Sequence, residues 1–138
     1  MSGEGDLQTL LREMQPLLHP EKYVFCNVNE DVFPSLNLHP LATFREQEGI
    51  TLVLQQRQAE GHSLSYEGVW ALITLQVHSS LQAVGFLAKI TAALAQAGVS
   101  VNVFSAYYHD HLLIPWEKRL QALNILKGIW QSNKLIDR

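Results

Sequence analysis

The second half of the sequence predicts the order strand, helix, strand, strand and helix, and this order limits the fold most. Trp70–Val77 is almost wholly apolar, which is typical of a strand covered on both faces. Leu81–Ala97 has a helical pattern, Val99–Tyr107 alternates, and Leu112–Ile114 reads as a third strand. The first two strands need a right-handed crossover, and a hairpin makes the third antiparallel. The pattern is that of a ferredoxin-like βαββαβ unit without its last strand.

That last strand is missing from the end of the sequence. A final helix begins near Pro115, and Gln131–Arg138 after it is too polar for a core strand. The buried stripe of this helix is predicted to contain Trp116, Leu120, Leu123, Leu126 and Trp130. Because an unfilled sheet edge favours aggregation, we expect Tyr23–Val28 or a neighbouring segment to fill it. The two halves are then interlocked by strand exchange.

The first half predicts a helix, a strand and a hairpin. The expected elements are a helix over Asp6–Leu18 that Asp6 caps and that Pro16 and Pro20 end early, a strand over Tyr23–Val28, and a loop over Asn29–Pro40. They are followed by paired strands over Leu41–Glu46 and Ile50–Gln55 with Gly49 at the turn, and by a polar stretch over Gln56–Gly68 that fits a short helix or turn. We therefore expect an α+β fold of two ferredoxin-like halves. The N-terminal half spans 1–66 and the C-terminal half spans 67–138.

The helix predicted over Leu81–Ala97 carries very few polar side chains. Gln82, Lys89 and Gln96 are seven residues apart and form one narrow polar stripe, whereas almost all of the rest is apolar or small. One face of a sheet cannot cover such a helix, so a second layer or a partner subunit is implied. Charged residues make up 17% of the chain, below the roughly 25% of average chains. Both features favour a homodimer.

Charge and composition exclude several function classes. The net charge is −3 and the pI about 6.0, and no run of basic residues is present. Nucleic acid and anionic membrane surfaces are therefore not expected as partners. Met1–Asp6 lacks the features of a secretory signal, and no apolar run approaches the roughly 20 residues of a membrane span. The single cysteine, Cys26, is expected to be a small buried hydrophobe, and a reducing cytoplasm fits best.

Several runs in the sequence resemble a known family. The runs WALITL (70–75), HSSL (78–81), VG (84–85) and AGVSV (97–101) resemble the ACT domain, the small regulatory module of amino-acid metabolism. NVFSAYYHDH (102–111), together with ATFRE (42–46) and GITLVL (49–54), is similar to a bacterial family of stand-alone paired ACT proteins. Those proteins resemble the ACT pairs of aspartate kinases and the CASTOR-type sensors. The resemblance covers roughly residues 5–127.

The resemblance implies a small amino-acid-like ligand at an interface between ACT halves or subunits. In ACT domains the first strand-to-helix loop and the following helix N-terminus hold the ligand, and here these positions are His78, Ser79, Ser80, Val84 and Gly85. General chemistry agrees, because free N–H groups at a helix N-terminus attract a carboxylate. Ser79 or Ser80 is expected to cap that helix, which places its N–H groups around Ser79–Leu81.

The other wall of the predicted site comes from the second strand and the turn after it. Ser100 and Asn102 are the expected strand residues, and the turn residues are Tyr107, Tyr108, His109 and Asp110. Many metabolic ACT domains have Asn where this chain has Ser100, so the identity of the ligand cannot be carried over.

Two other roles compete for the histidines and the turn. His109 and His111, with His78, invite a metal site, but no Cys or further His-rich cluster completes a ligand set. The favoured interpretation is a hairpin turn in which Asp110 bonds its own backbone. No metal and no cofactor are therefore expected.

No catalytic motif is present. The sequence contains no nucleophile elbow, no phosphate-binding Gly-rich loop and no carboxylate pair within the apolar strands. We expect a non-enzymatic, cytoplasmic regulatory module that binds a small amino-acid-like ligand and reports occupancy to a protein partner. The alternative is a ligand-free dimerisation platform that acts through protein–protein interaction.

Overall fold

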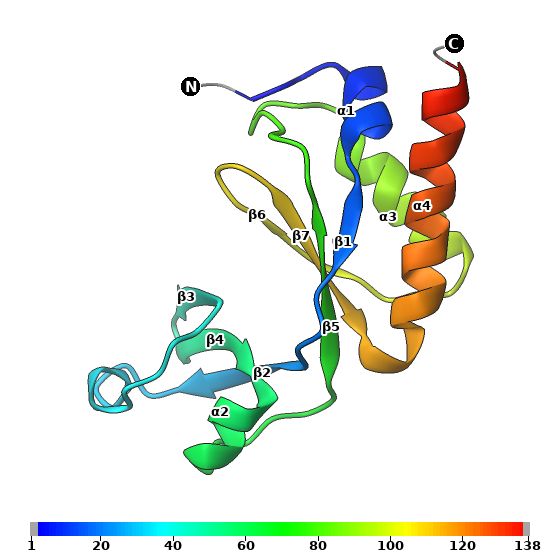
Figure 1. Cartoon of the computed structure of the whole chain (residues 1–138). Coiled ribbons are helices and arrows are strands. Elements are labelled where there is room, and N and C mark those ends of the chain that lie inside the picture. Colours follow the sequence, from blue (N-terminus) through cyan, green and yellow to red (C-terminus); the bar gives the residue numbers. More distant parts are fainter. Residues whose placement is uncertain (1–2, 137–138) are drawn as a thin grey trace. The chain divides into compact units, whose positions relative to one another are not determined.

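The computed structural model describes residues 3–136, which form two compact units (Figure 1). Unit 1 combines Met1–Pro20 with Ala71–Arg138, and unit 2 is Glu21–Trp70. The fold is mixed α/β, as expected from the sequence. Among residues 3–136, no helix is both long enough and apolar enough to cross a bilayer.

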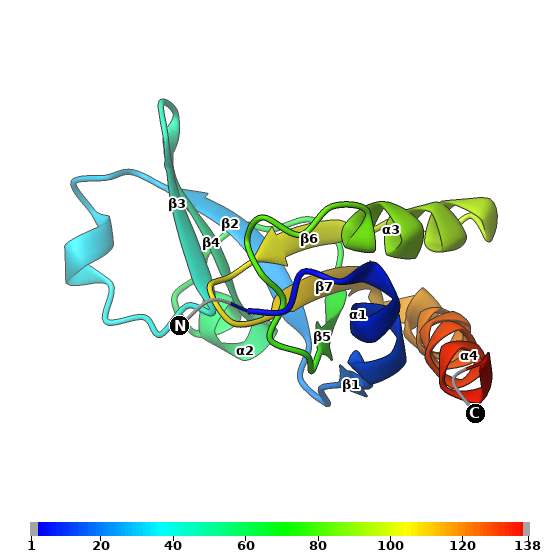
Figure 2. The ribbon, with the colours of Figure 1, turned by 90° about the horizontal axis from the view of Figure 1, so that it is seen from above.

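Unit 1 contains a sheet with three helices on one face. Its strands are β1 (Pro16–Leu18), β5 (Trp70–Leu75, of which Trp70 belongs to unit 2), β6 (Asn102–Ser105) and β7 (Asp110–Pro115). Their order is β1-β5-β7-β6, with β1 antiparallel to β5 and β6 antiparallel to β7. The helices are α1 (Leu7–Glu13), α3 (Phe86–Gln96) and α4 (Arg119–Ile136), and η2 (Trp116–Lys118) is a short 3₁₀ turn before α4. Figure 2 shows the three helices on the same side of β5 and β7.

The core of unit 1 lies between these helices and the sheet. Ile73 and Leu75 of β5 and Ile114 of β7 alternate with residues that face the other way, as the period of two in a strand requires. The helices contribute the fully or almost fully buried side chains Leu10, Leu11, Phe86, Ile90, Leu94, Ala122 and Leu126. This packing fixes the positions of β5, α3 and β7, which carry the candidate site.

The N-terminal segment ends differently from the prediction. A helix over Asp6–Leu18 was expected, but α1 ends at Glu13 and Pro16–Leu18 is a strand. Pro16 has no N–H for a helical hydrogen bond, and Gln15 just before it has φ 32°. The predicted cap is confirmed, because Asp6 accepts a hydrogen bond from the Thr9 N–H. Within unit 1, β1 fills the edge of β5. The strand exchange between the halves and their boundary at residue 66 stay predictions.

Unit 2 is a small antiparallel sheet with one short helix. β2 (Tyr23–Val28) pairs with β4 (Gly49–Gln55) along its whole length, and β3 (Ala42–Glu46) pairs with the other edge of β4. The strand expected over Tyr23–Val28 is confirmed, and so is the hairpin. α2 (Gln56–Gly61) follows β4, and η1 (Phe33–Ser35) interrupts the long loop. The core includes Val24, Cys26, Leu52 and Leu54.

The prediction placed the start of helix α3 too early. α3 begins at Phe86 rather than Leu81, because Gly85 adopts φ 90° and breaks any helix before it. The Ser80 hydroxyl accepts from the Gln82 N–H, and the Ala83 N–H donates to the Ser80 carbonyl, so these residues form a turn. Gln82 therefore lies in a loop, outside the predicted polar stripe. Neither Ser79 nor Ser80 caps α3.

Three further differences concern the last strands and helix. Only Asn102–Ser105 of the stretch Val99–Tyr107 is a strand. Asp110 belongs to β7 and not to the turn, so the predicted Asp110 turn is wrong. α4 continues to Ile136, and Leu120 is 59% exposed instead of buried, since it lies on the outer face of that helix.

Candidate functional site

A small pocket lies in unit 1 in front of the N-terminus of α3. Its volume is about 140 Å³, which corresponds to several water molecules. The loop before α3, the first turn of α3 and the β6–β7 hairpin surround it. The lining residues are Ser79, Ser80, Leu81, Ala83, Gly85, Phe86, Leu87, Ala88, Ser105 and Asp110.

One wall of this pocket carries a buried carboxylate. Asp110 is 5% exposed and Ser79 is 6% exposed. The Ser79 hydroxyl donates to Asp110 Oδ2 at 2.9 Å, which fixes one oxygen of the carboxylate. Ser105 pairs with Asp110 across the β6–β7 hairpin and brings a second hydroxyl to the same wall. A buried carboxylate is costly unless it is hydrogen-bonded or paired with a cation. The wall is therefore suited to an ammonium group.

The opposite wall is the first turn of α3. Gly85 lies at the N-cap and has no side chain to accept from the following N–H groups. The N–H groups of the first helical residues, Phe86, Leu87 and Ala88, have no carbonyl partner within the helix. These N–H groups carry the positive end of the helix dipole, and the three residues line the pocket. The pocket thus combines an anion-binding end with a carboxylate.

The N-terminal segment holds the loop before α3 in place. The Glu4 N–H donates to the His78 carbonyl at 2.7 Å, and the Ser80 N–H donates to the Glu4 carbonyl at 2.7 Å. A Cβ at Gly3 would lie 2.6 Å from the His78 carbonyl oxygen, so only glycine fits there. The Ser80 N–H is consequently already bonded within the protein.

Several aromatic and aliphatic side chains that neighbour the lining residues in the sequence are exposed. The His78 and Tyr108 rings are 4.8 Å apart, and the Tyr107 and Tyr108 rings 5.0 Å. Both tyrosines are more than half exposed, as are Leu81 and Val84 in the loop before α3. These four exposed residues are called the rim below.

The structure brings together only part of the predicted site. Ser79, Ser80, Gly85 and Asp110 line the pocket, and His78 packs against Tyr107 and Tyr108. Val84, Ser100, Asn102 and His109 do not line it. Asn102 pairs with Leu113 in the hairpin, and His109 lies beside His111. Whether any of the eleven predicted residues contacts a ligand stays a prediction.

Six of the lining residues are not among the eleven predicted site residues. Leu81, Ala83, Phe86, Leu87 and Ala88 were assigned to a helix that started too early, and Ser105 to a longer strand. The signal for the first five was Gly85, whose freedom at positive φ marks a helix boundary. Ser105 could not be found without the hairpin register.

The histidines do not converge on one point. His111 Nδ1 and His19 Nε2 both lie 2.9 Å from Thr74 Oγ1, whereas His78 packs on the tyrosines. Among residues 3–136, no group of three His, Cys, Asp or Glu side chains is arranged to hold a metal ion. The described residues therefore give no support to a metal site made from His78, His109 and His111. Burial, with the nearby His109 and His19, lowers the pKa of His111.

Comparison with known proteins identifies the family. Residues 2–71 match a family model described as ACT domain, and residues 67–128 match a second model of that description. The chain belongs to the ACT domain family. Among curated proteins, no sequence matches this ACT protein.

Solved structures agree with this assignment. A Vibrio cholerae protein of unknown function, described as a possible transport protein, is 45% identical to this ACT protein, with a TM-score of 0.81 over 90% of this chain and 95% of that one. The ligand-free regulatory subunit of aspartate kinase from Thermus thermophilus has a TM-score of 0.65 at 12% identity, over 83% and 95% of the chains. A protein from Agrobacterium tumefaciens has a TM-score of 0.64 at 14% identity, over 83% and 87%. The Thermus thermophilus and Agrobacterium tumefaciens proteins share the fold of this chain.

Proposed function

We propose that this ACT protein is a non-enzymatic regulatory module that binds a small amino acid in the pocket between the α3 N-terminus and Asp110. One observation carries the proposal: a buried carboxylate and an open helix N-terminus line the same pocket. An amino acid carries the two complementary charges on neighbouring atoms. A neutral molecule or a simple anion would match only one of the walls.

In this arrangement the ligand's carboxylate accepts from the N–H groups of Phe86, Leu87 and Ala88. Its ammonium donates to the Asp110 carboxylate, whose other interaction is the Ser79 hydroxyl. This replaces the binding mode expected from the sequence, in which the carboxylate lay against Ser79–Leu81. The volume of about 140 Å³ favours a small side chain.

The fold of the relatives supports a regulatory role. One solved structure with this fold is, by its name, the regulatory subunit of aspartate kinase. The match covers 83% of this chain and 95% of that chain, so both chains consist mostly of the shared fold. Ligand binding would act by favouring one packing arrangement of the protein over another, in a homodimer or with a regulated protein partner. The cytoplasm is the proposed location.

The rim supports a second candidate function, a ligand-free dimerisation platform. Val84 is 84% exposed, and Leu81, Tyr107 and Tyr108 are each more than half exposed. Exposed apolar side chains of this size are typical of protein interaction surfaces. A platform needs the rim but does not need the buried carboxylate.

A thermal-shift screen against the twenty free amino acids separates the two functions. A ligand at a hundred times its dissociation constant adds about 2.7 kcal/mol to the free energy of unfolding, which a melting curve resolves. Asp110→Asn should lower the shift to about half or less, and Asp31→Asn, which changes an exposed carboxylate in unit 2, should leave it unchanged. If no amino acid raises the melting temperature, the platform is favoured.

A further inference from the structure

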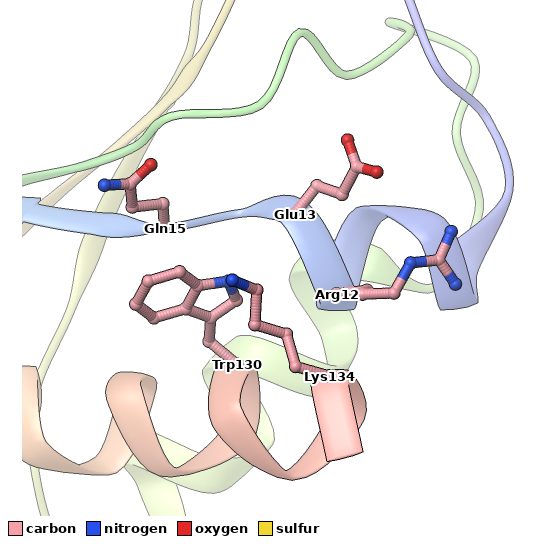
Figure 3. Close-up of a pocket in the computed structure, with 5 residues that line it drawn as sticks. All are labelled: Arg12, Glu13, Gln15, Trp130 and Lys134. Atoms are coloured by element: carbon pink, nitrogen blue, oxygen red, sulfur yellow. The ribbon is translucent and has the colours of Figure 1, made fainter. Parts of the chain in front are cut away.

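A second and larger cavity of unit 1 lies where α1 ends beside the last turns of α4. Its volume is about 480 Å³, and it is lined by Arg12, Glu13, Gln15, Trp130 and Lys134 (Figure 3). This volume is within the range of roughly 300–1,000 Å³ of small-molecule sites. It shares no lining residue with the pocket at Asp110. It is called the Trp130 cleft below.

Trp130, which lines this cleft, carries a buried hydrogen-bond donor without an acceptor. In the described part of the chain, the buried Nε1 of Trp130 has no hydrogen-bond partner. An indole N–H can only donate, and buried donors in folded proteins almost always have an acceptor. Of the lining residues, only Glu13 and Gln15 carry side-chain acceptors, and Figure 3 shows both groups extending away from the indole.

A cation covers the same ring. The Lys134 ammonium lies 4.7 Å from the centre of the Trp130 ring, in a cation–π arrangement. An ammonium group is also a pure donor, so it cannot satisfy the indole N–H. Lys134 is exposed, and its flexible side chain can move to meet a ligand. One oxygen acceptor between the two donors would satisfy both.

The charges around the cleft favour a singly charged acceptor. Arg12 also lines the cleft and contributes a positive charge to its surroundings, and its guanidinium donates to the Thr9 hydroxyl at 3.4 Å. Glu13 brings a carboxylate to the same lining, and its repulsion would grow with the charge of a bound anion. A doubly charged phosphate is therefore disfavoured relative to a carboxylate. Charge-assisted bonds from Lys134 and the indole N–H suit a carboxylate oxygen.

We propose that the Trp130 cleft binds a small monocarboxylate, held by the Trp130 N–H and the Lys134 ammonium. This site is independent of the amino-acid pocket at Asp110. Trp130 and Lys134 are its ligand-binding residues, and the Glu13 carboxylate limits the charge of the ligand.

The test is a titration of ¹⁵N-labelled protein followed through the indole N–H signals. The sequence has three tryptophans, so three indole signals are expected, and Trp130→Phe identifies one of them. Sodium acetate, glycine and inorganic phosphate are added in turn at constant ionic strength. Acetate or glycine should move the Trp130 signal in a saturable way and leave those of Trp70 and Trp116 in place.

Two charge variants on the same helix complete the test. Lys134→Met keeps most of the side-chain length over the ring and removes the ammonium, so carboxylate affinity should fall about tenfold. Lys127→Met, at an exposed position seven residues earlier on α4, should change nothing. The proposal is overturned if neither carboxylate gives saturable movement, if only phosphate does, or if Lys134→Met binds like the wild type.

Discussion

Ser79 and Asp110 are 31 positions apart in the sequence, and their side chains share a buried hydrogen bond of 2.9 Å. Ser79 precedes the turn that leads into α3, whereas Asp110 begins β7. The bond therefore lies within the carboxylate wall of the pocket and orients one oxygen of the Asp110 carboxylate. The second oxygen is the one that the proposed ammonium group meets.

The Ser79 hydroxyl should contribute measurably to stability. Ser79→Ala removes a donor to a buried carboxylate, which should lower the free energy of unfolding by about 1.5–3 kcal/mol. Urea denaturation followed by circular dichroism measures the change. Ser132→Ala, at an exposed position of α4, is the matched control and should be neutral or slightly stabilising. Equal effects of the two substitutions would contradict the buried bond.

Gly85 and Gly128 should respond oppositely to alanine. Gly85 has φ 90°, and the nearest atom to an added Cβ is Leu7 Cδ2 at 3.8 Å, so the cost is backbone strain rather than a clash. Gly85→Ala should destabilise by about 1–2 kcal/mol. Gly128 lies inside α4 with nothing within 4 Å of an added Cβ, and Gly128→Ala should stabilise by about 0.5–1 kcal/mol. Melting temperatures measure both, and a stabilising Gly85→Ala would disprove the helix start at Phe86.

His111 should make the protein less stable in mild acid. Burial, with the charges of His109 and His19, lowers its pKa in the folded state below the ordinary 6.5, against the opposing effect of Asp110. Between these two pKa values the unfolded chain binds more protons. The free energy of unfolding should therefore fall as the pH decreases below about 6.5, and level off below the folded pKa.

His111→Gln tests this contribution. The variant removes the titrating group and keeps a hydrogen-bonding side chain near Thr74 Oγ1, which the His111 ring contacts at 2.9 Å. The pH dependence of the free energy of unfolding should become flatter below pH 6.5. His39→Gln, at an exposed position of unit 2, should keep the wild-type slope. An unchanged slope in His111→Gln would show that other groups cause the dependence.

Cys26 should be inert towards thiol reagents in the native state. It is 4% exposed on β2, and burial raises its pKa, so little reactive thiolate forms at neutral pH. Its reaction with a disulfide reagent such as Ellman's should require opening of unit 2 and should accelerate in urea. Fast stoichiometric reaction in native buffer would place the thiol at the surface instead.

The periodicity of the sequence predicted most elements, because it depends on local side-chain spacing. Tyr23–Val28 was found at its full length, and the hairpin around Gly49 within one residue at each strand. The segment Pro16–Leu18 was missed, since three residues are too short to show a strand period and follow a helical run of leucines. What makes it a strand is its tertiary pairing with β5.

The backbone around the candidate pocket was predicted less well, and two residues explain why. The apolar run Leu81–Val84 resembles the first turn of a helix, and only the positive φ of Gly85 shows that the helix begins later. Aspartate is common in turns, but the hairpin register places Asp110 in β7 opposite Ser105. Both errors concern backbone geometry that hydrophobic spacing does not encode.

The proposed function requires Asp110 and the α3 N-terminus to bind one amino acid together. The most direct test is a calorimetric titration of wild-type protein and Asp110→Asn with the amino acid that raises the melting temperature most. Asparagine preserves the size of the side chain and removes its charge, so affinity should fall about tenfold or more. Saturable binding by the wild type with this loss in the variant is the predicted result. Equal affinity in both proteins, or no binding by the wild type, would contradict the account.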